Sequence, residues 1–334
     1  MTRVRPDEPS PAVALVRCAD INAAIAVLTI DHGYRLEMIM PADNPRVAEL
    51  SRDGERIRLQ VDAIEPTPPA VAAPGAFLLT RASAHGHWVP GRAGMRYRDL
   101  IPGRLRGRYI GSHICIPEGG PVEDYVHYHQ VRFQMIYCLR GWVRVVYEDQ
   151  GEPFVLHPGD CVLQPPTIRH RVLEASAGLE VLEIGGPAEH PTFREHALEL
   201  PTTQLQPMRR YGGQGFVRHV AAGAPWLPAG PSGLEYRDTG IARATGGMAD
   251  VRVLRARLSD ASAIARPIGT EADDCELLFL HVLAGELTLA GDACGTEALS
   301  EGDSCVVPAG AQFTLGVVAD CQFLEVRVRA PNFG

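Results

Sequence analysis

The chain has 334 residues, of which 46 % are hydrophobic, and 40 acidic against 32 basic side chains give it a net charge of −8. This is the composition of a globular protein with room for two or three hydrophobic cores, and the acidic balance argues against a general nucleic-acid or anionic-membrane binder. All 32 basic residues are arginines, which excludes a Schiff-base lysine, a pyridoxal-phosphate anchor and a Walker-type phosphate loop. The 34 glycines and 27 prolines predict many turns and a mainly β protein.

The first unit, residues 1–62, is predicted to be a small α+β module. A strand is expected over residues 12–18, and Asp20 is the expected N-cap of a helix over residues 21–30. Residues 34–40 and 46–61 predict three more strands, the last two joined by a turn at Asp53-Gly54. The order is therefore strand, helix, strand, strand, strand. A proline-rich linker follows at residues 63–76.

Two series of short strands make up the rest of the chain. They are expected at residues 77–197 and 233–334, with a loop-rich connector at residues 198–232. The two series share landmarks in the same order and at nearly constant spacing, which indicates a duplicated all-β domain. The matched landmarks are Tyr97-Arg98-Asp99 with Tyr236-Arg237-Asp238, Leu139-Arg140-Gly141 with Leu283-Ala284-Gly285, Gly159-Asp160 with Gly302-Asp303, and Pro165 with Pro308.

The first series contains a histidine constellation typical of a metal site. His127 and His129 are two residues apart in a predicted strand, so their side chains lie on the same face. His170 follows in a later strand. Three converging imidazoles suit zinc, iron, copper, nickel or manganese, and Gln134 offers a carbonyl oxygen as a possible fourth ligand or as a hydrogen-bonding partner.

These residues resemble the two motifs of the cupin superfamily. The first motif runs from His127-X-His129 through Gln134 to Gly141, and the second runs from Gly159 through Pro165-Pro166-Thr167 to His170. Gln134 replaces the usual Glu, Thr167 replaces the usual Gly, and Gly159 is one residue out of place. The resemblance implies two cupin β-barrels of the double-stranded β-helix (jelly-roll) type, preceded by the α+β module.

The resemblance also implies one divalent transition metal (Fe, Zn, Ni or Mn) per chain, held by His127, His129, His170 and possibly Gln134. The second copy is expected to lack a site, as in a bicupin with one degenerate barrel. Alignment of the landmarks without gaps places Glu271, Asp273, Leu278 and Phe313 at the positions of His127, His129, Gln134 and His170. Leucine and phenylalanine cannot ligate a metal.

The N-terminal unit resembles one βαβββ half-module of the glyoxalase, or vicinal oxygen chelate, superfamily. The resemblance lies in the segments Gly33-Tyr34-Arg35-Leu36 and Pro41-Ala42-Asp43-Asn44-Pro45. Its first strand contains no histidine, so a packing role is expected. A second His-X-His, His85-Gly86-His87, is flanked by loop residues and is interpreted as surface.

Four residues are candidates for the substrate pocket. Ile136 and Cys138 share the strand parity of Gln134 and are expected to face the barrel interior, while His113 lies on a strand entering the barrel; the candidates are His113, Ile136, Cys138 and Val172. The resemblance favours a metal-dependent dioxygenase acting on an enolisable or aromatic small molecule, with Gln134 tuning or ligating the metal. A non-redox isomerase, lyase or cyclase and a non-catalytic binding protein are the alternatives.

The eight cysteines form no CxxC pair and lie mostly in apolar strand-like runs, which favours scattered thiols in a reducing compartment. The first eleven residues contain no apolar signal core, so a cytoplasmic protein is expected. The expected partners are a small-molecule substrate and a second copy of the chain in a homodimer, with no nucleic acid and no membrane.

Overall fold

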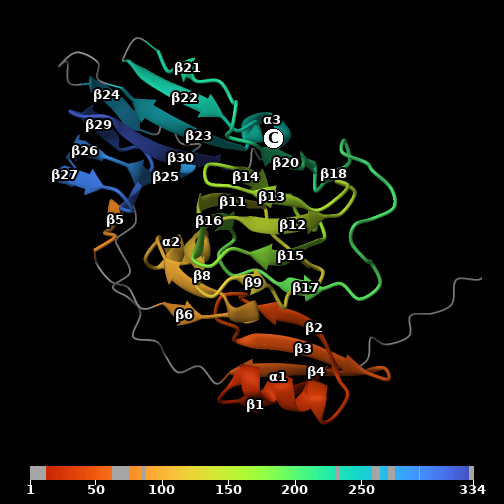
Figure 1. Ribbon diagram of the computed structural model, residues 1–334. Helices are drawn as coiled ribbons and strands as arrows, with labels where there is room; N and C mark the ends of the chain where they lie inside the picture. Colours follow the sequence, from red (N-terminus) through yellow and green to blue (C-terminus); the bar gives the residue numbers. More distant parts are fainter. Residues whose placement is uncertain are drawn as a thin grey trace, which may run out of the picture.

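The computed structural model describes residues 13–61, 76–83, 88–230, 233–257, 264–269, 275–292 and 294–330. Three units follow one another along the chain, with the first barrel between the N-terminal module and the second barrel (Figure 1). The linker expected at residues 63–76 lies almost entirely outside the described residues, as does the His85-Gly86-His87 sequence. No helix among the described residues is long and apolar enough to cross a membrane.

The N-terminal module has the expected order of one helix and four strands. Asp20 caps the helix, because its Oδ1 accepts hydrogen bonds from the backbone N–H groups of Asn22 and Ala23. The apolar faces of the sheet enclose a small core that includes Leu50 and Leu59. The elements are β1 (Val13–Cys18), α1 (Ile21–Ile30), β2 (Arg35–Met40), β3 (Val47–Arg52) and β4 (Glu55–Val61).

The first barrel consists of two facing sheets. One has the strand order β17-β10-β15-β12-β13, with β9 beside β15, and the other has the order β20-β14-β11-β16-β8-β7-β6. The strands are β6 (Val89–Pro90), β7 (Arg96–Asp99), β8 (Ile110–Ile116), β9 (Gly120–Pro121), β10 (His127–His129), β11 (Phe133–Arg140), β12 (Val143–Tyr147), β13 (Phe154–Leu156), β14 (Cys161–Leu163), β15 (His170–Ala175), β16 (Leu179–Gly186), β17 (Thr192–Arg194) and β20 (Val217–His219). Short elements are η1 (Arg92–Gly94), α2 (Arg104–Gly107) and the hairpin β18 (Arg210–Tyr211) and β19 (Gln214–Gly215).

The second barrel repeats the strand order of the first, without counterparts of β9 and β17 among the described residues. Its sheets have the orders β21-β22-β23-β30-β25-β28-β5 and β24-β29-β26-β27. The elements are β5 (Leu78–Thr80), β21 (Leu227–Pro228), β22 (Leu234–Asp238), α3 (Ile241–Ala244), β23 (Ala249–Ala256), β24 (Ile264–Gly269), β25 (Cys275–Ala284), β26 (Glu286–Gly291), β27 (Gly295–Ser300), β28 (Ser304–Val307), β29 (Gln312–Val317) and β30 (Cys321–Arg329). The duplication predicted from the landmarks is present in the fold.

Two short strands cross between the barrels. The strand β5 was assigned to the first barrel, but it pairs with β28 of the second. The strand β20 lies in the connector, and it pairs with β14 of the first barrel. In Figure 1 the orange β5 lies beside the blue strands of the second barrel. Each of these pairings joins segments that are far apart in sequence, so no local sequence pattern predicts it.

Alternating side chains of the barrel strands form three cores, one inside each barrel and one between the two barrels. In β11, Phe133, Met135 and Tyr137 belong to a core shared by the two barrels, together with Phe279 and Val326. The intervening side chains of β11 point into the first barrel. A further core fills the second barrel. The barrels therefore pack sheet against sheet, and the interior of the first barrel remains available for a site.

Candidate metal centre

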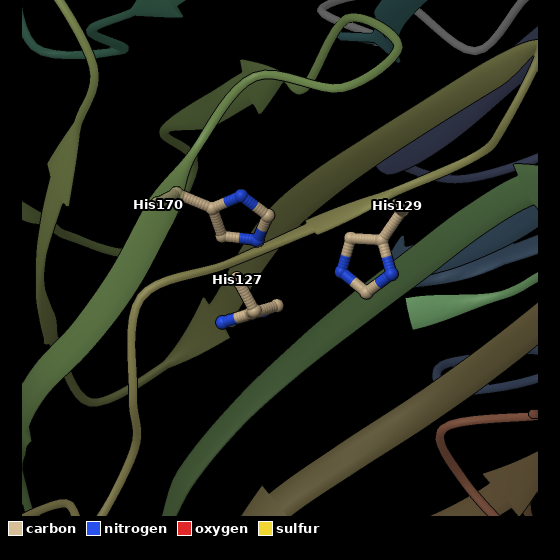
Figure 2. A group of neighbouring side chains, drawn as sticks. All are labelled: His127, His129 and His170. Carbon is tan, nitrogen blue, oxygen red and sulfur yellow. The ribbon is translucent and has the colours of Figure 1, made fainter. Parts of the chain in front are cut away.

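The three histidines predicted to gather lie together inside the first barrel. His127 and His129 are on β10, and His127 is directly opposite His170 on β15. One ring nitrogen from each histidine lies within 4.8 Å of the other two, and all three side chains are buried. Figure 2 shows the three rings gathered around a common space. The i, i+2 spacing places the two histidines of β10 on one face.

Hydrogen bonds hold each ring by the nitrogen on its far side. His127 Nδ1 donates to the Tyr125 carbonyl oxygen at 2.8 Å, and His170 Nδ1 donates to that of Ile168 at 3.0 Å. His129 Nδ1 is hydrogen-bonded to the Thr192 hydroxyl at 2.9 Å. A carbonyl only accepts, so in His127 and His170 the proton lies on Nδ1 and Nε2 is left to bind a metal. Such partners orient metal-binding histidines, and this donor set fits a divalent transition metal.

The backbone before His170 is held in an unusual conformation. Thr167 replaces the usual glycine of the motif and has a φ of 65°, in the left-handed region that favours glycine. Its N–H donates to the His129 carbonyl oxygen at 3.0 Å. This bond ties the turn that precedes His170 to the strand carrying His129, so the unfavourable conformation occurs where it positions two of the histidines.

Asp124 is a carboxylate beside the cluster that the sequence did not indicate. Its Oδ1 lies 3.6 Å from His127 Nδ1 and accepts from the Tyr125 N–H at 2.9 Å, and its Oδ2 accepts from the Val172 N–H at 2.9 Å. The side chain is fully buried. Asp124 therefore connects β15 with the segment that precedes β10, and its carboxylate lies next to His127.

Gln134 on β11 is buried and lines the same cavity as His129 and His170. Its Nε2 donates to Glu183 Oε1 at 2.6 Å, while its own Oε1 is buried and has no hydrogen-bond partner among the described residues. Glu183 lies on β16 and was not singled out from the sequence, because no motif connects two residues that are 49 positions apart. An unsatisfied buried oxygen is costly, and its presence beside the histidines fits a cation or a donor group bound there.

The cavity has an apolar body and one polar end. The polar lining side chains include His129, Gln134, Tyr147, Gln164, His170 and Glu183, and the aliphatic walls include Ile114, Ile136, Val143, Val172 and Val181. Burial raises the pKa of Tyr147 far above its usual range, so the phenol stays neutral and accepts from Gln164 Nε2 at 2.9 Å. A cavity with this lining suits a small, mostly apolar molecule.

Two of the four candidate pocket residues line this cavity, Ile136 and Val172, and two do not. Cys138 is buried in the barrel core and is absent from the described lining. His113 was expected at the pocket, but it has the opposite parity to Ile114 on β8. It points toward the second barrel, where it is hydrogen-bonded to Arg98 and Glu180.

The second barrel places apolar residues at two positions equivalent to the site. Leu278 is on β25 and is buried in the second core, as is Phe313 on β29. Phe313 is paired with Ile268, as His170 is paired with His127. Ile268 is thus equivalent to His127, which corrects the gapless alignment that placed Glu271 there; Glu271 and Asp273 lie outside the described residues. Three extra residues between β24 and β25 cause the shift.

His190 is another neighbour that the sequence analysis missed. Its ring packs edge-on against His129, with the ring centroids 5.3 Å apart. Its Nδ1 donates to the Pro187 carbonyl oxygen at 2.8 Å, and its Nε2 is buried with no hydrogen-bond partner within the described ranges. The N-terminal module also contributes, because Ala42 lines the cavity. The module therefore does more than pack against the barrel.

Comparisons with known proteins agree with this architecture. Residues 112–185 match the cupin domain. No curated protein sequence matches the chain. Among solved structures, a mutant of salicylate 1,2-dioxygenase from Pseudoaminobacter salicylatoxidans is similar, with 15 % identity and a TM-score of 0.54 over 80 % of this chain and 88 % of that one.

Two other solved structures are similar over most of the chain. Oxalate decarboxylase from Bacillus subtilis has 13 % identity and a TM-score of 0.52 over 78 % of each chain, and another structure of it is described by its Mn(II) centres. Protein Ylba from E. coli has 12 % identity and a TM-score of 0.53 over 77 % of this chain and 92 % of that one. Likeness at this identity concerns the fold, and with the matched domain it confirms the resemblance to the cupin superfamily.

Proposed function

We propose that this two-barrel cupin is a metal-dependent dioxygenase acting on an enolisable or aromatic small molecule. The observation that carries the proposal is the convergence of His127, His129 and His170 within 4.8 Å, each held at Nδ1 so that Nε2 can ligate. One divalent transition metal per chain is the expected cofactor, with iron, zinc, nickel and manganese all compatible with a neutral nitrogen and oxygen donor set.

The bound metal supplies Lewis acidity and open coordination positions. The chain supplies the rest: three buried histidines that are each held at Nδ1, a neutral oxygen from Gln134, and aliphatic walls that exclude water from the reacting groups. The carboxylates nearby, Glu183 and Asp124, contact Gln134 and lie beside His127. The donor set is therefore neutral, and an enolate or phenolate oxygen of the substrate would be its first negative ligand.

The metal site is tested by metal content. The wild-type protein, purified without added metal, is expected to hold one equivalent of transition metal per chain, and the second barrel none, because Leu278 and Phe313 cannot ligate. His127→Ala and His170→Ala are expected to lose it. His157→Ala is the matched control, because His157 is exposed and outside the cluster. A full equivalent retained in both cluster variants would refute the assignment.

The reaction class is tested by the dependence on oxygen. Oxygen uptake with a panel of enolisable and aromatic compounds, in the protein loaded with Fe(II), is expected and should stop in His127→Ala. The neutral Gln134 also favours a second candidate, a non-redox isomerase, lyase or cyclase, because the site lacks an anionic ligand to offset metal oxidation. Turnover under argon would support that candidate, and ligand binding without turnover would indicate a binding protein.

A further inference from the structure

The amide of Gln134 is oriented by Glu183. A carboxylate has only acceptor oxygens, so the 2.6 Å contact with Glu183 Oε1 requires the NH2 end of the amide to point at Glu183. The opposite end, Oε1, then has to face away from Glu183, and it is the atom that is buried without a hydrogen-bond partner in the part of the chain that the structure describes. The orientation of the amide follows from the chemistry of its partner.

The pairing of β11 with β16 leaves space for the contact between Gln134 and Glu183. Gln134 is opposite Gly185 across the β11–β16 ladder, and Glu183 is opposite Ile136 on the same face. A Cβ atom at Gly185 would lie 3.2 Å from the Phe133 carbonyl oxygen and 3.6 Å from Gln134 Cγ, so glycine leaves the space beside the glutamine open. Gln134 can therefore lean toward Glu183 while both line the cavity that contains His129 and His170.

We infer that Gln134 and Glu183 act as one unit, in which Gln134 presents a neutral oxygen to the metal and Glu183 orients that oxygen and carries the negative charge. The inference rests on the proposed function. The charge of the glutamate that the cupin motif has at position 134 is thus present, but it lies outside the metal's own ligands. Glu183 is a positioning residue, because it acts through Gln134.

Exchanging the two residues tests the unit. Gln134→Glu alone places two carboxylates 2.6 Å apart in the wild-type geometry, and their repulsion should destabilise the metal-free protein. Adding Glu183→Gln restores an amide donor, now on residue 183, and gives the metal an anionic ligand. The double variant should therefore be as stable as wild type without metal and should bind Co²⁺ at least tenfold more tightly. Glu183→Gln alone leaves the amide orientation unfixed and should weaken Co²⁺ binding severalfold.

The measurements are Co²⁺ affinity by calorimetry, the visible absorption spectrum of bound Co²⁺, and the melting temperature of the metal-free protein. Glu180→Gln is the control, because Glu180 lies on β16 but contacts His113 outside the barrel. A purely structural role for Glu183 predicts that the double variant is less stable than either single variant, and that result would overturn the inference. The same Co²⁺ spectrum and affinity in all four proteins would also overturn it while leaving the proposed function intact. Failure of the wild-type protein to bind any metal would instead refute the proposed function.

Discussion

His281 is a buried histidine that the second barrel has at the place of Tyr137 in the first. Tyr137 pairs with Cys161 on β14, and His281 pairs with Ser304 on β28, whose hydroxyl is 2.8 Å from His281 Nδ1. Burial, with smaller contributions from the neighbouring His113 and Arg98, lowers the pKa of His281 to about 3, and the Asp303 carboxylate opposes this shift. His281 is therefore neutral in the folded protein at any pH near neutrality.

This histidine should make the protein sensitive to acid. Its ordinary pKa of about 6.5 applies in the unfolded chain, so between pH 6.5 and 3 the unfolded chain binds a proton that the folded protein does not. Stability is therefore complete above pH 6.5 and falls by about 1.4 kcal/mol per pH unit as the pH is lowered toward 3. His281→Asn keeps a donor for Ser304 without titrating. The unfolding free energies of wild type and variant are measured by urea unfolding at pH 7, 6 and 5. Below pH 6.5 the wild type should lose stability relative to the variant by about 1.4 kcal/mol per pH unit. A difference that does not change with pH would contradict the prediction.

Residue spacing predicted the histidines of the site but not their partners. His127 and His129 are adjacent on one strand, and the motif linked them to His170. Asp124 and Glu183 carry no comparable pattern, because their contacts depend on how the strands pair. The orientation of Gln134 could not be predicted for the same reason. Ligands that a motif fixes are thus readable from sequence, whereas the residues that orient them come from tertiary structure.

At the scale of elements, the two crossing strands β20 and β5 are each held by a buried aspartate that accepts a backbone hydrogen bond. Asp160 Oδ1 accepts from the Ala221 N–H just after β20, and Asp303 Oδ1 accepts from the Ala82 N–H just after β5, each at 2.7 Å. Both aspartates also accept through Oδ2 from a backbone N–H three residues earlier. Arg81 adds an ion pair to Asp303 at 3.1 Å. Each barrel therefore anchors the strand that leads into the other.

Removing either anchor should destabilise the pair of barrels. In Asp160→Asn or Asp303→Asn one acceptor oxygen becomes an NH2 group that faces a backbone N–H. We expect a loss of about 1.5–3 kcal/mol in unfolding free energy for each, because hydrogen bonds to charged groups contribute that much. Asp303→Asn should cost at least as much as Asp160→Asn, since it also loses the ion pair. Asp292→Asn, at an exposed position, should change stability by less than about 0.5 kcal/mol. Urea unfolding checks the order, and equal stability of all three variants would contradict it.

The order of the helices and strands was largely predictable from the sequence. The residue-by-residue alignment of the second barrel with the first was not. The helix at Ile21–Ile30 has the predicted bounds, since its cap and its flanking turns are local signals. The alignment of Glu271 with His127 was wrong by three residues, because the length of a loop is not constrained by the sheet that it joins. The crossing strands had no local signal at all.

At the scale of the whole molecule, the N-terminal module and the first barrel share one sheet. The strand β2 pairs with β17, and β17 pairs with β10, so Ile39 is beside Thr192 and Thr192 is beside His129. Thr192 also holds the ring of His129 by its hydroxyl. The module thus supports the strand that carries two histidines. Figure 1 shows this sheet continuing from the module into the barrel.

Exposed apolar side chains on the N-terminal module lead us to predict self-association. In the described part of the chain β1 is at the edge of the shared sheet, and it exposes Val13, Leu15 and Val16, while α1 exposes Val27 and Ile30. The two barrels cover each other's sheet faces within one chain, so the module is where a second copy gains most by covering apolar surface and an open strand edge. We predict a homodimer with twice the mass of the 36.2 kDa chain in light scattering at micromolar concentration. Leu15→Glu should give a monomer, whereas Val318→Glu, on an exposed residue of the second barrel, should not. A monomeric wild-type protein would refute the dimer, and dissociation by Val318→Glu alone would move the interface to the second barrel.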